Sequence, residues 1–200
     1  MQFQEGQIYH VYNQGNNHQK IFFDRDNYLF FLNKLRVHIL PHADVLAWCF
    51  PDRNREPNHF HLEIYINQLD VEVKLSEVIT KTRTLNQSIA IILRSYTRAI
   101  NKQRKRSGSL FRPKTKAECV SCVHGITPSF YINNGLTHIN ISDPEKQYPK
   151  TLFDYIHQNP VKSNLVKNEK DWEFSSAKDY YQNRGGTLIN KSRVEMFFDI

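Results

Sequence analysis

The chain has 200 residues, 40% of them hydrophobic, and a formal net charge of +7, which together suit a single globular domain. No apolar run approaches the roughly 18 residues of a membrane span, and the N-terminus lacks the basic and apolar regions of a signal peptide. Three cysteines, an odd number without a secretion signal, argue against a disulfide framework. We therefore expect a soluble, cytoplasmic protein with no membrane partner.

A strand, a helix and a second strand are predicted in the first 50 residues. Residues 7–13 are rich in β-branched and aromatic side chains, which favours a strand. Apolar residues recur at helical spacing over residues 27–40, and Asp24 or Asp26 can cap the start of this helix. Residues 44–50 form an apolar strand, and a polar connection follows it.

Residues 57–66 alternate between polar odd positions and large apolar even positions, as a half-buried strand does. Residues i and i+2 of a strand face the same way, about 7 Å apart, so His59 and His61 share the polar face. Two imidazoles placed in this way can converge on a single metal ion. The alternative is a solvent-facing strand that carries two histidines. Glu63 shares this face; we interpret it as a surface carboxylate, with approach to the ion as the alternative.

The middle of the chain is predicted to contain one clear helix. Residues 70–84 are charged and are expected to form a loop or the start of a helix. Over residues 85–102 an apolar stripe and a separate basic stripe indicate an amphipathic helix. A basic strand or hairpin is expected at residues 110–119, and an irregular insertion at about residues 120–148.

The excess positive charge comes from one segment. Residues 94–116 contain nine basic residues and no acidic one, so the remainder of the chain carries +7 − 9 = −2. Such clustering indicates a surface that binds a polyanion, nucleic acid above all, although a solvated basic loop is the alternative. The candidate phosphate contacts are Arg94, Arg98, Lys102, Arg104, Lys105, Arg106, Arg112 and Lys114.

A further helix is predicted over residues 151–161. It places Tyr155 and Asn159 on the same face, four residues apart. Pro160 disfavours helical geometry at the residue before it, so Asn159 is expected at the end of the helix. The aromatic residues after position 172 suit packing back onto the domain, and residues 194–198 are expected to form a docked helix or a partner contact.

Cys119 and Cys122, with His124 close by, are spaced like half of a structural zinc site. Because no second cysteine pair follows at zinc-binding spacing, we interpret them as thiols without a metal.

Two of these stretches together resemble a known family. Pro57-Asn58-His59-Phe60-His61, followed by Tyr155-Ile156-His157-Gln158-Asn159-Pro160-Val161, resembles the single-tyrosine transposases of the His-hydrophobe-His (HUH) nuclease superfamily. The branch with the greatest similarity is the REP-associated tyrosine transposases, which residues 10–17, 107–111 and 172–176 also fit. The chain departs from the branch in longer segments at residues 51–56 and 120–150.

The resemblance implies an α+β fold, with a ferredoxin-like antiparallel sheet, helices packed on it and the His-hydrophobe-His stretch on a central strand. It also implies a catalytic domain over residues 1–176 and a C-terminal tail over residues 177–200. The expected activity is metal-dependent cleavage and rejoining of single-stranded or hairpin DNA through a 5′-phosphotyrosine intermediate. By this resemblance Tyr155 is the catalytic nucleophile.

The resemblance assigns His59, His61 and Asn159 as ligands of a divalent metal. A set of two imidazoles and one amide oxygen is compatible with Mg²⁺ or Mn²⁺. The protein is expected to be a monomer or a homodimer. Two alternatives remain at this point: a non-catalytic DNA-binding relative, and a metal-dependent hydrolase of a small molecule.

Overall fold

The computed structural model describes residues 1–51, 58–74, 76–77, 79–122, 132–133, 136–137 and 144–198. A four-stranded antiparallel sheet lies at its centre, in the order β2-β3-β1-β6. The strands are β1 (Ile8–Gln14), β2 (Ala43–Cys49), β3 (His59–Ile66) and β6 (Lys116–Cys119). The strand with His59 and His61 therefore lies in the interior of the sheet, between β2 and β1.

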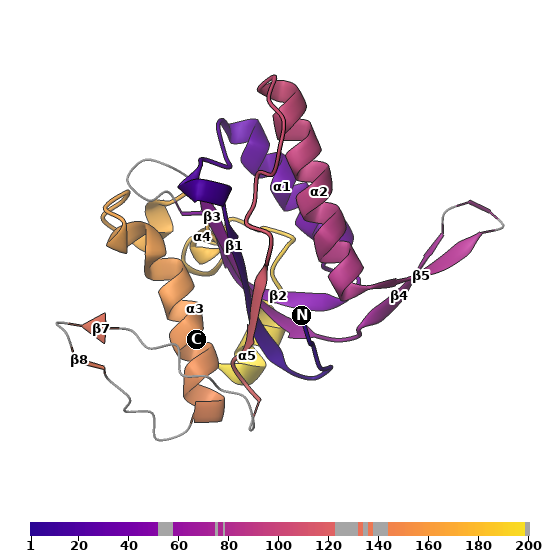
Figure 1. Ribbon diagram of the computed structural model, residues 1–200. Helices are drawn as coiled ribbons and strands as arrows, with labels where there is room; N and C mark the ends of the chain where they lie inside the picture. Colours follow the sequence, from indigo (N-terminus) through magenta and orange to yellow (C-terminus); the bar gives the residue numbers. More distant parts are fainter. Residues whose placement is uncertain are drawn as a thin grey trace.

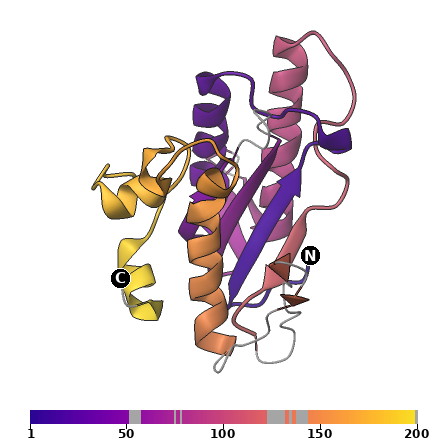
Figure 2. The same ribbon diagram turned by 90° about the vertical axis from the view of Figure 1, so that its left-hand side faces the viewer.

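Helices cover both faces of this sheet (Figures 1 and 2). Helix α1 (Arg25–His38) connects β1 to β2, and α2 (Leu85–Gln103) lies between β3 and β6 in the chain. Together with the strands they follow the β-α-β-β-α-β order of ferredoxin-like folds. Helix α3 (Pro144–Lys162) crosses the opposite face. The predicted mixed α+β class with an antiparallel sheet is confirmed.

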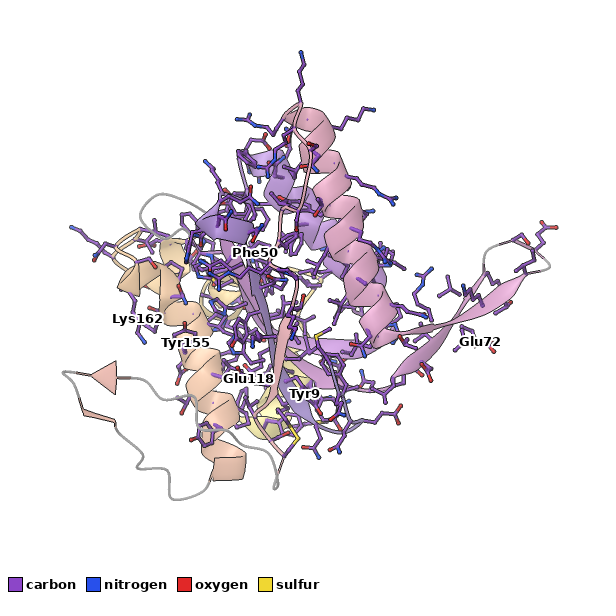
Figure 3. All side chains as sticks on the ribbon, viewed as in Figure 1. Tyr9, Phe50, Glu72, Glu118, Tyr155 and Lys162 are labelled. Carbon is purple, nitrogen blue, oxygen red and sulfur yellow. A yellow bond between two sulfur atoms is a disulfide. The ribbon has the colours of Figure 1, made fainter. Side chains whose placement is uncertain are left out.

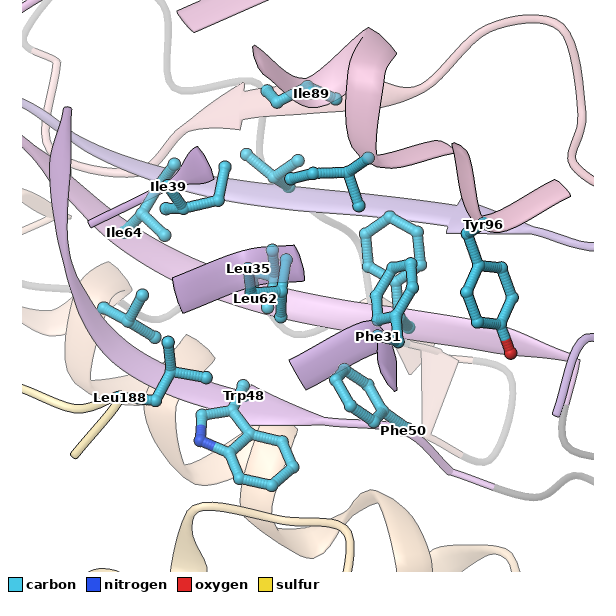
Figure 4. Close-up of a cluster of buried hydrophobic side chains, with 14 of the residues drawn as sticks. Phe31, Leu35, Ile39, Trp48, Phe50, Leu62, Ile64, Ile89, Tyr96 and Leu188 are labelled. Atoms are coloured by element: carbon cyan, nitrogen blue, oxygen red, sulfur yellow. The ribbon is translucent and has the colours of Figure 1, made fainter. Parts of the chain in front are cut away.

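The main hydrophobic core lies between the sheet and the helices α1 and α2 (Figure 4). It is rich in aromatic residues: Phe31 of α1 and Tyr96 of α2 are fully buried, with ring centroids 5.0 Å apart in an edge-to-face arrangement. The hydroxyl of Tyr96 donates a hydrogen bond to the backbone oxygen of Ile21 (2.8 Å), which satisfies its polar atom inside the core. The even positions of β3, such as Leu62, point into this core as predicted.

Both of these helices begin at capping residues. The side chain of Asp24 accepts a hydrogen bond from the backbone N–H of Asn27, which confirms the first of the two predicted caps of α1. Thr84 and Gln87 form a reciprocal capping box at the start of α2.

A loop or helix start was expected at residues 70–84, and this prediction is wrong. The chain forms a two-stranded antiparallel hairpin, β4 (Asp70–Lys74) and β5 (Thr80–Thr84), which projects from the domain (Figure 1). Its strands alternate charged residues with valine in β4 and with threonine in β5, and β-branched residues favour extended backbone. The helical pattern begins only after Thr84.

The predicted insertion at residues 120–148 ends earlier than expected, because α3 already begins at Pro144. Within it the structure describes two short paired strands, β7 (Ile132–Asn133) and β8 (Leu136–Thr137). Most of the rest of this segment lies outside the described residues, as does most of the lengthened connection at residues 51–56.

Helix α3 also ends later than predicted. Asn159 lies inside it rather than at its end, since the helix continues through Pro160 to Lys162 and the N–H of Ser163 donates to the oxygen of Asn159 (3.0 Å). Proline removes one backbone donor from a helix. Packing of the fully buried Phe153 of α3 on the sheet outweighs that local preference.

The expectation of free thiols at Cys119 and Cys122 is also corrected. The two cysteines are joined in a disulfide at the end of β6, and Cys49 is a buried free thiol.

The C-terminal segment packs against the domain. It contains a 3₁₀ turn (η2, Glu169–Asp171) and two short helices, α4 (Ala177–Tyr181) and α5 (Lys191–Phe197); a similar turn, η1 (Asn16–His18), follows β1. Phe174 stacks on Tyr28 of α1, with parallel rings 3.7 Å apart, and its backbone oxygen accepts from the N–H of Phe50 (3.0 Å). No helix in the described part of the chain is both long and apolar enough to cross a membrane.

We predict that Phe174→Ala lowers the free energy of unfolding by about 3–5 kcal/mol, the usual cost of removing a buried phenylalanine ring. Phe197→Ala is the matched control, because Phe197 is 40% exposed whereas Phe174 is 8% exposed. The control is expected to cost about 1 kcal/mol or less. Urea titrations followed by fluorescence measure both values; equal losses would show that the segment does not stabilise the core as described.

Candidate functional site

A polar surface lies on the face of the sheet that α3 covers. It is formed by the odd positions of β3 and by side chains of β1 that pair with them across the strands: Tyr12 lies opposite His61, and His10 lies opposite Glu63. Residues that alternate along two paired strands share a face, so the strand register brings these side chains together.

The two histidines of β3 meet as the sequence predicts. The ring centroids of His59 and His61 lie 5.0 Å apart and the rings are nearly perpendicular (88°). His61 is 6% exposed, whereas His59 is intermediate in exposure. The polar face of β3 is therefore covered at His61 and partly open at His59.

Each of these imidazoles has a hydrogen-bond partner at its Nδ1 atom. Nδ1 of His59 lies 2.7 Å from the side-chain oxygen of Asn58. Nδ1 of His61 lies 2.9 Å from Nε2 of His10 on the neighbouring strand β1. With Nδ1 engaged in both rings, Nε2 is the atom that each ring presents for binding an ion.

Helix α3 brings Tyr155 and Asn159 to His61. The ring of Tyr155 lies 5.6 Å from that of His61, edge to face, and the amide nitrogen of Asn159 lies 3.5 Å from Nε2 of His61. Tyr155 is 39% exposed and Asn159 only 7%. Figure 3 shows Tyr155 and Lys162 on α3; the Lys162 ammonium lies 5.2 Å from the centre of the tyrosine ring.

The buried imidazoles are held in the neutral form. Burial lowers the pKa of His10 to about 3. Burial, and then repulsion from His10 and His59, lowers the pKa of His61 well below its usual range. A neutral imidazole has a nitrogen lone pair available at pH 7, which is the form that binds metals.

The residues present fit a divalent ion with mixed nitrogen and oxygen ligands. His59 and His61 would supply nitrogen, and the side-chain oxygen of Asn159 would be the third donor if its amide were turned from the orientation in the structure. Within the described residues there is no cluster of three or more His, Cys, Asp or Glu side chains that could hold a metal. The amide is therefore needed to complete the set.

Glu63 is not the surface carboxylate that the sequence suggested. It is fully buried, and within the described structure neither of its oxygens has a hydrogen-bond partner. Burial, and then the negative charge of Asp154, raises its pKa well above the usual value, although Lys150 opposes this. A period of two identifies a polar face, but it does not show whether a later helix covers that face.

The predicted basic residues divide into two groups. Half of them line a groove of about 1000 Å³ between α2 and residues 108–117; these are Arg94, Arg98, Arg112 and Lys114. Lys102, Arg104, Lys105 and Arg106 lie at the C-terminal end of α2 and do not line it. Of these, Arg104 stacks on Phe23 (4.6 Å) and Arg106 donates a hydrogen bond to Gln19, so internal contacts already engage both side chains.

The groove lies beside α2 and Tyr155 lies on α3, on opposite faces of the sheet (Figure 2). A series of polar contacts leads from the groove to the end of β1, opposite His59. Gln14, which lies opposite His59 in the register, is within hydrogen-bonding distance of His18 (2.9 Å), and His18 in turn contacts Arg112 of the groove (3.3 Å).

Sequence reasoning missed His10 and Tyr12 as neighbours of the site. Their alternation in β1 was visible, but their position beside His61 depends on the pairing of β1 with β3. Tyr12 stacks on His10 (4.5 Å) and its hydroxyl donates to Glu118 of β6 (2.7 Å). Burial, and then this carboxylate, raises the pKa of Tyr12.

Comparison with known proteins gives one informative match. No family model and no curated protein matches the sequence. Among solved structures, the chain is similar to a REP-associated tyrosine transposase bound to a REP hairpin, with a TM-score of 0.55 and 17% sequence identity. The similarity covers 95% of this chain and 86% of that one. At this level of identity it shows that the two proteins share a fold.

We predict that Glu63→Gln stabilises the protein at alkaline pH. Because the pKa of Glu63 is raised in the folded state, its contribution to stability is complete below the unfolded value of 4.5 and is lost as pH rises from there toward the raised pKa. Glutamine does not titrate, so the gain at pH 8 should be about 1–3 kcal/mol and should disappear near pH 4.

Thermal unfolding between pH 4 and pH 8 measures this difference. Glu72→Gln is the control, because Glu72 is exposed on the β4–β5 hairpin (Figure 3). A pH profile of Glu63→Gln parallel to that of the wild type would show that Glu63 is solvated.

Proposed function

We propose that this protein is a metal-dependent transposase or endonuclease of the single-tyrosine HUH type, which cleaves and rejoins single-stranded or hairpin DNA. The observation that carries the proposal is the meeting of Tyr155 and Asn159 with His61, from elements far apart in the sequence. The shared fold with a transposase bound to a DNA hairpin supports the same class of substrate.

Tyr155 is the proposed nucleophile. Its phenol oxygen forms a bond to the phosphorus of a DNA phosphodiester, the P–O3′ bond breaks, and the 3′-hydroxyl leaves with the proton that the phenol gives up. The product is a 5′-phosphotyrosine ester, and its reversal joins a strand without an external energy source. The exposure of Tyr155 allows a strand to reach it, while α3 keeps it beside the histidines.

His59, His61 and Asn159 would hold the divalent ion, Mg²⁺ or Mn²⁺. When bound, this ion would neutralise charge on the non-bridging phosphate oxygens and orient the phosphate for in-line attack. The Lys162 ammonium above the ring of Tyr155 adds positive charge on the side open to solvent.

The groove is the proposed contact for the DNA backbone. Arg94 and Arg98 follow each other by one helical turn along α2, and Arg112 lies across from them. Among the described residues that line the groove, the one aromatic residue is Phe111, which is only 4% exposed. The lining is therefore suited to phosphates rather than to stacked bases. We propose that the DNA strand passes Gln14 and His18 between the groove and Tyr155.

A non-catalytic DNA-binding relative is the second candidate. Its support is the basic groove, which needs no chemistry at Tyr155 to bind DNA. A small-molecule hydrolase, by contrast, leaves both the groove and the position of Tyr155 unexplained.

We predict that Tyr155→Phe abolishes a metal-dependent covalent adduct with DNA. Wild type and variant are incubated with a pool of labelled single-stranded hairpins, with Mn²⁺ or with EDTA, and run on a denaturing gel. Tyr181→Phe is the matched control, because Tyr181 is 48% exposed on α4, where its ring lies 6.2 Å from that of His157 of α3. An adduct that persists in Tyr155→Phe would assign the nucleophile to another residue; no adduct in the wild type, with DNA binding intact, would favour the non-catalytic candidate.

We predict that Arg98→Gln weakens DNA binding by about the same factor for all sequences. Each phosphate contact that is removed should reduce the slope of log affinity against log salt by about 1. Arg36→Gln is the control, because Arg36 is exposed on α1, outside the groove. Fluorescence anisotropy at several salt concentrations measures both variants; an unchanged slope for Arg98→Gln would remove the groove from the DNA interface.

A further inference from the structure

We propose that His10, which is outside the metal-binding set, is a positioning residue that fixes the tautomer and ring orientation of His61 by accepting a hydrogen bond from its Nδ1 atom. This proposal rests on the metal site proposed above.

The contact between the two rings is direct and buried. Nε2 of His10 lies 2.9 Å from Nδ1 of His61, the rings are tilted by only 22°, and both residues are at most 9% exposed. His10 lies opposite Glu63 in the register, so it reaches His61 diagonally across the strands. A hydrogen bond at this distance, between side chains that neighbours enclose, restricts rotation of the imidazole.

The second hydrogen-bond partner of His61 indicates which atom donates. The amide nitrogen of Asn159 faces Nε2 of His61 at 3.5 Å, and an amide nitrogen only donates. With the amide in this orientation, Nε2 of His61 is the acceptor in the metal-free protein, and the proton of the ring is on Nδ1. It follows that Nδ1 of His61 donates and that Nε2 of His10 accepts.

His59 shows the same arrangement with a different partner. The amide nitrogen of Asn58 donates to the backbone oxygen of His18 (3.3 Å), which leaves the side-chain oxygen of Asn58 facing Nδ1 of His59 (2.7 Å). Nδ1 of His59 is thus also a donor. Two imidazoles, held by residues from separate segments, both keep the lone pair on Nε2. Outer partners of this kind orient metal-binding histidines and increase their basicity.

The first test uses the metal-free protein and needs neither DNA nor activity. Long-range ¹H–¹⁵N spectra of the histidine rings show which nitrogen of each ring carries the proton, and His61→Gln identifies the signals of His61. We expect the Nδ1–H form of His61 in the wild type and in His10→Gln, whose side-chain oxygen can accept the same hydrogen bond. His10→Leu should give a mixture of both forms. An Nε2–H form in the wild type, or an unchanged spectrum in His10→Leu, would overturn the proposal.

The second test measures Mn²⁺ affinity by electron paramagnetic resonance titration. His10→Leu should bind about 10–100-fold more weakly than the wild type, and His10→Gln should restore most of the affinity. His42→Leu is the matched control, since His42 is also buried and its ring is bonded to one side chain, Ser88 (2.9 Å), on the α2 side. A role for His10 in stability alone would lower the unfolding temperature without changing Mn²⁺ affinity.

The two tests separate this proposal from the proposed function. If the wild type and His10→Leu bind Mn²⁺ equally well, the role of His10 is overturned and the metal site is unaffected. Wild-type protein that binds no Mn²⁺, with or without DNA, would overturn the metal site and the positioning role with it.

Discussion

The packing of α3 on the sheet is the interaction on which the candidate site depends. Phe153 and Ile156 of α3 are fully buried in an apolar cluster with Leu46 and Ala47 of β2, and burial of such a side chain contributes about 1.5–3 kcal/mol. These apolar contacts hold Tyr155 and Asn159 over His61. They also cover Glu63, whose unpartnered carboxylate costs about 1–3 kcal/mol. Covering Glu63 therefore lowers the stability of the fold, and burial of the apolar residues of the same helix offsets this cost.

A second contact fixes the helix one turn beyond Phe153. His157 is buried on α3, and its Nε2 lies 2.7 Å from the hydroxyl of Ser176, which also accepts from the N–H of Trp48 in β2 (2.9 Å). One serine thus connects α3, the C-terminal segment and the sheet. Because Tyr155 is two residues from His157 on α3, the C-terminal segment helps to fix the orientation of the proposed nucleophile.

The sequence predicted those features that depend on the residues of a single helix or strand. The alternation in β3, the stripes of α2 and the spacing of Tyr155 and Asn159 each depend on one element, and each is found in the structure. The β4–β5 hairpin was missed because its strands are short and charged. The burial of Glu63 and the contact of His10 with His61 were missed for another reason: both depend on which elements pack together, and a single-strand pattern carries no information about its partner.

On the proposed function, the two faces of the sheet have different roles, because the groove and Tyr155 lie on opposite faces. On the proposed function, the groove contributes affinity that depends on salt but not on sequence, because its side chains suit phosphates. On the same proposal, the chemistry would take place where His61 and Asn159 are enclosed, whereas Tyr155 is exposed and His59 is intermediate in exposure. A strand running from the groove to Tyr155 would then bend past Gln14 and His18. Single-stranded DNA bends far more easily than a duplex, so this route by itself favours cleavage in an unpaired segment next to a bound stem.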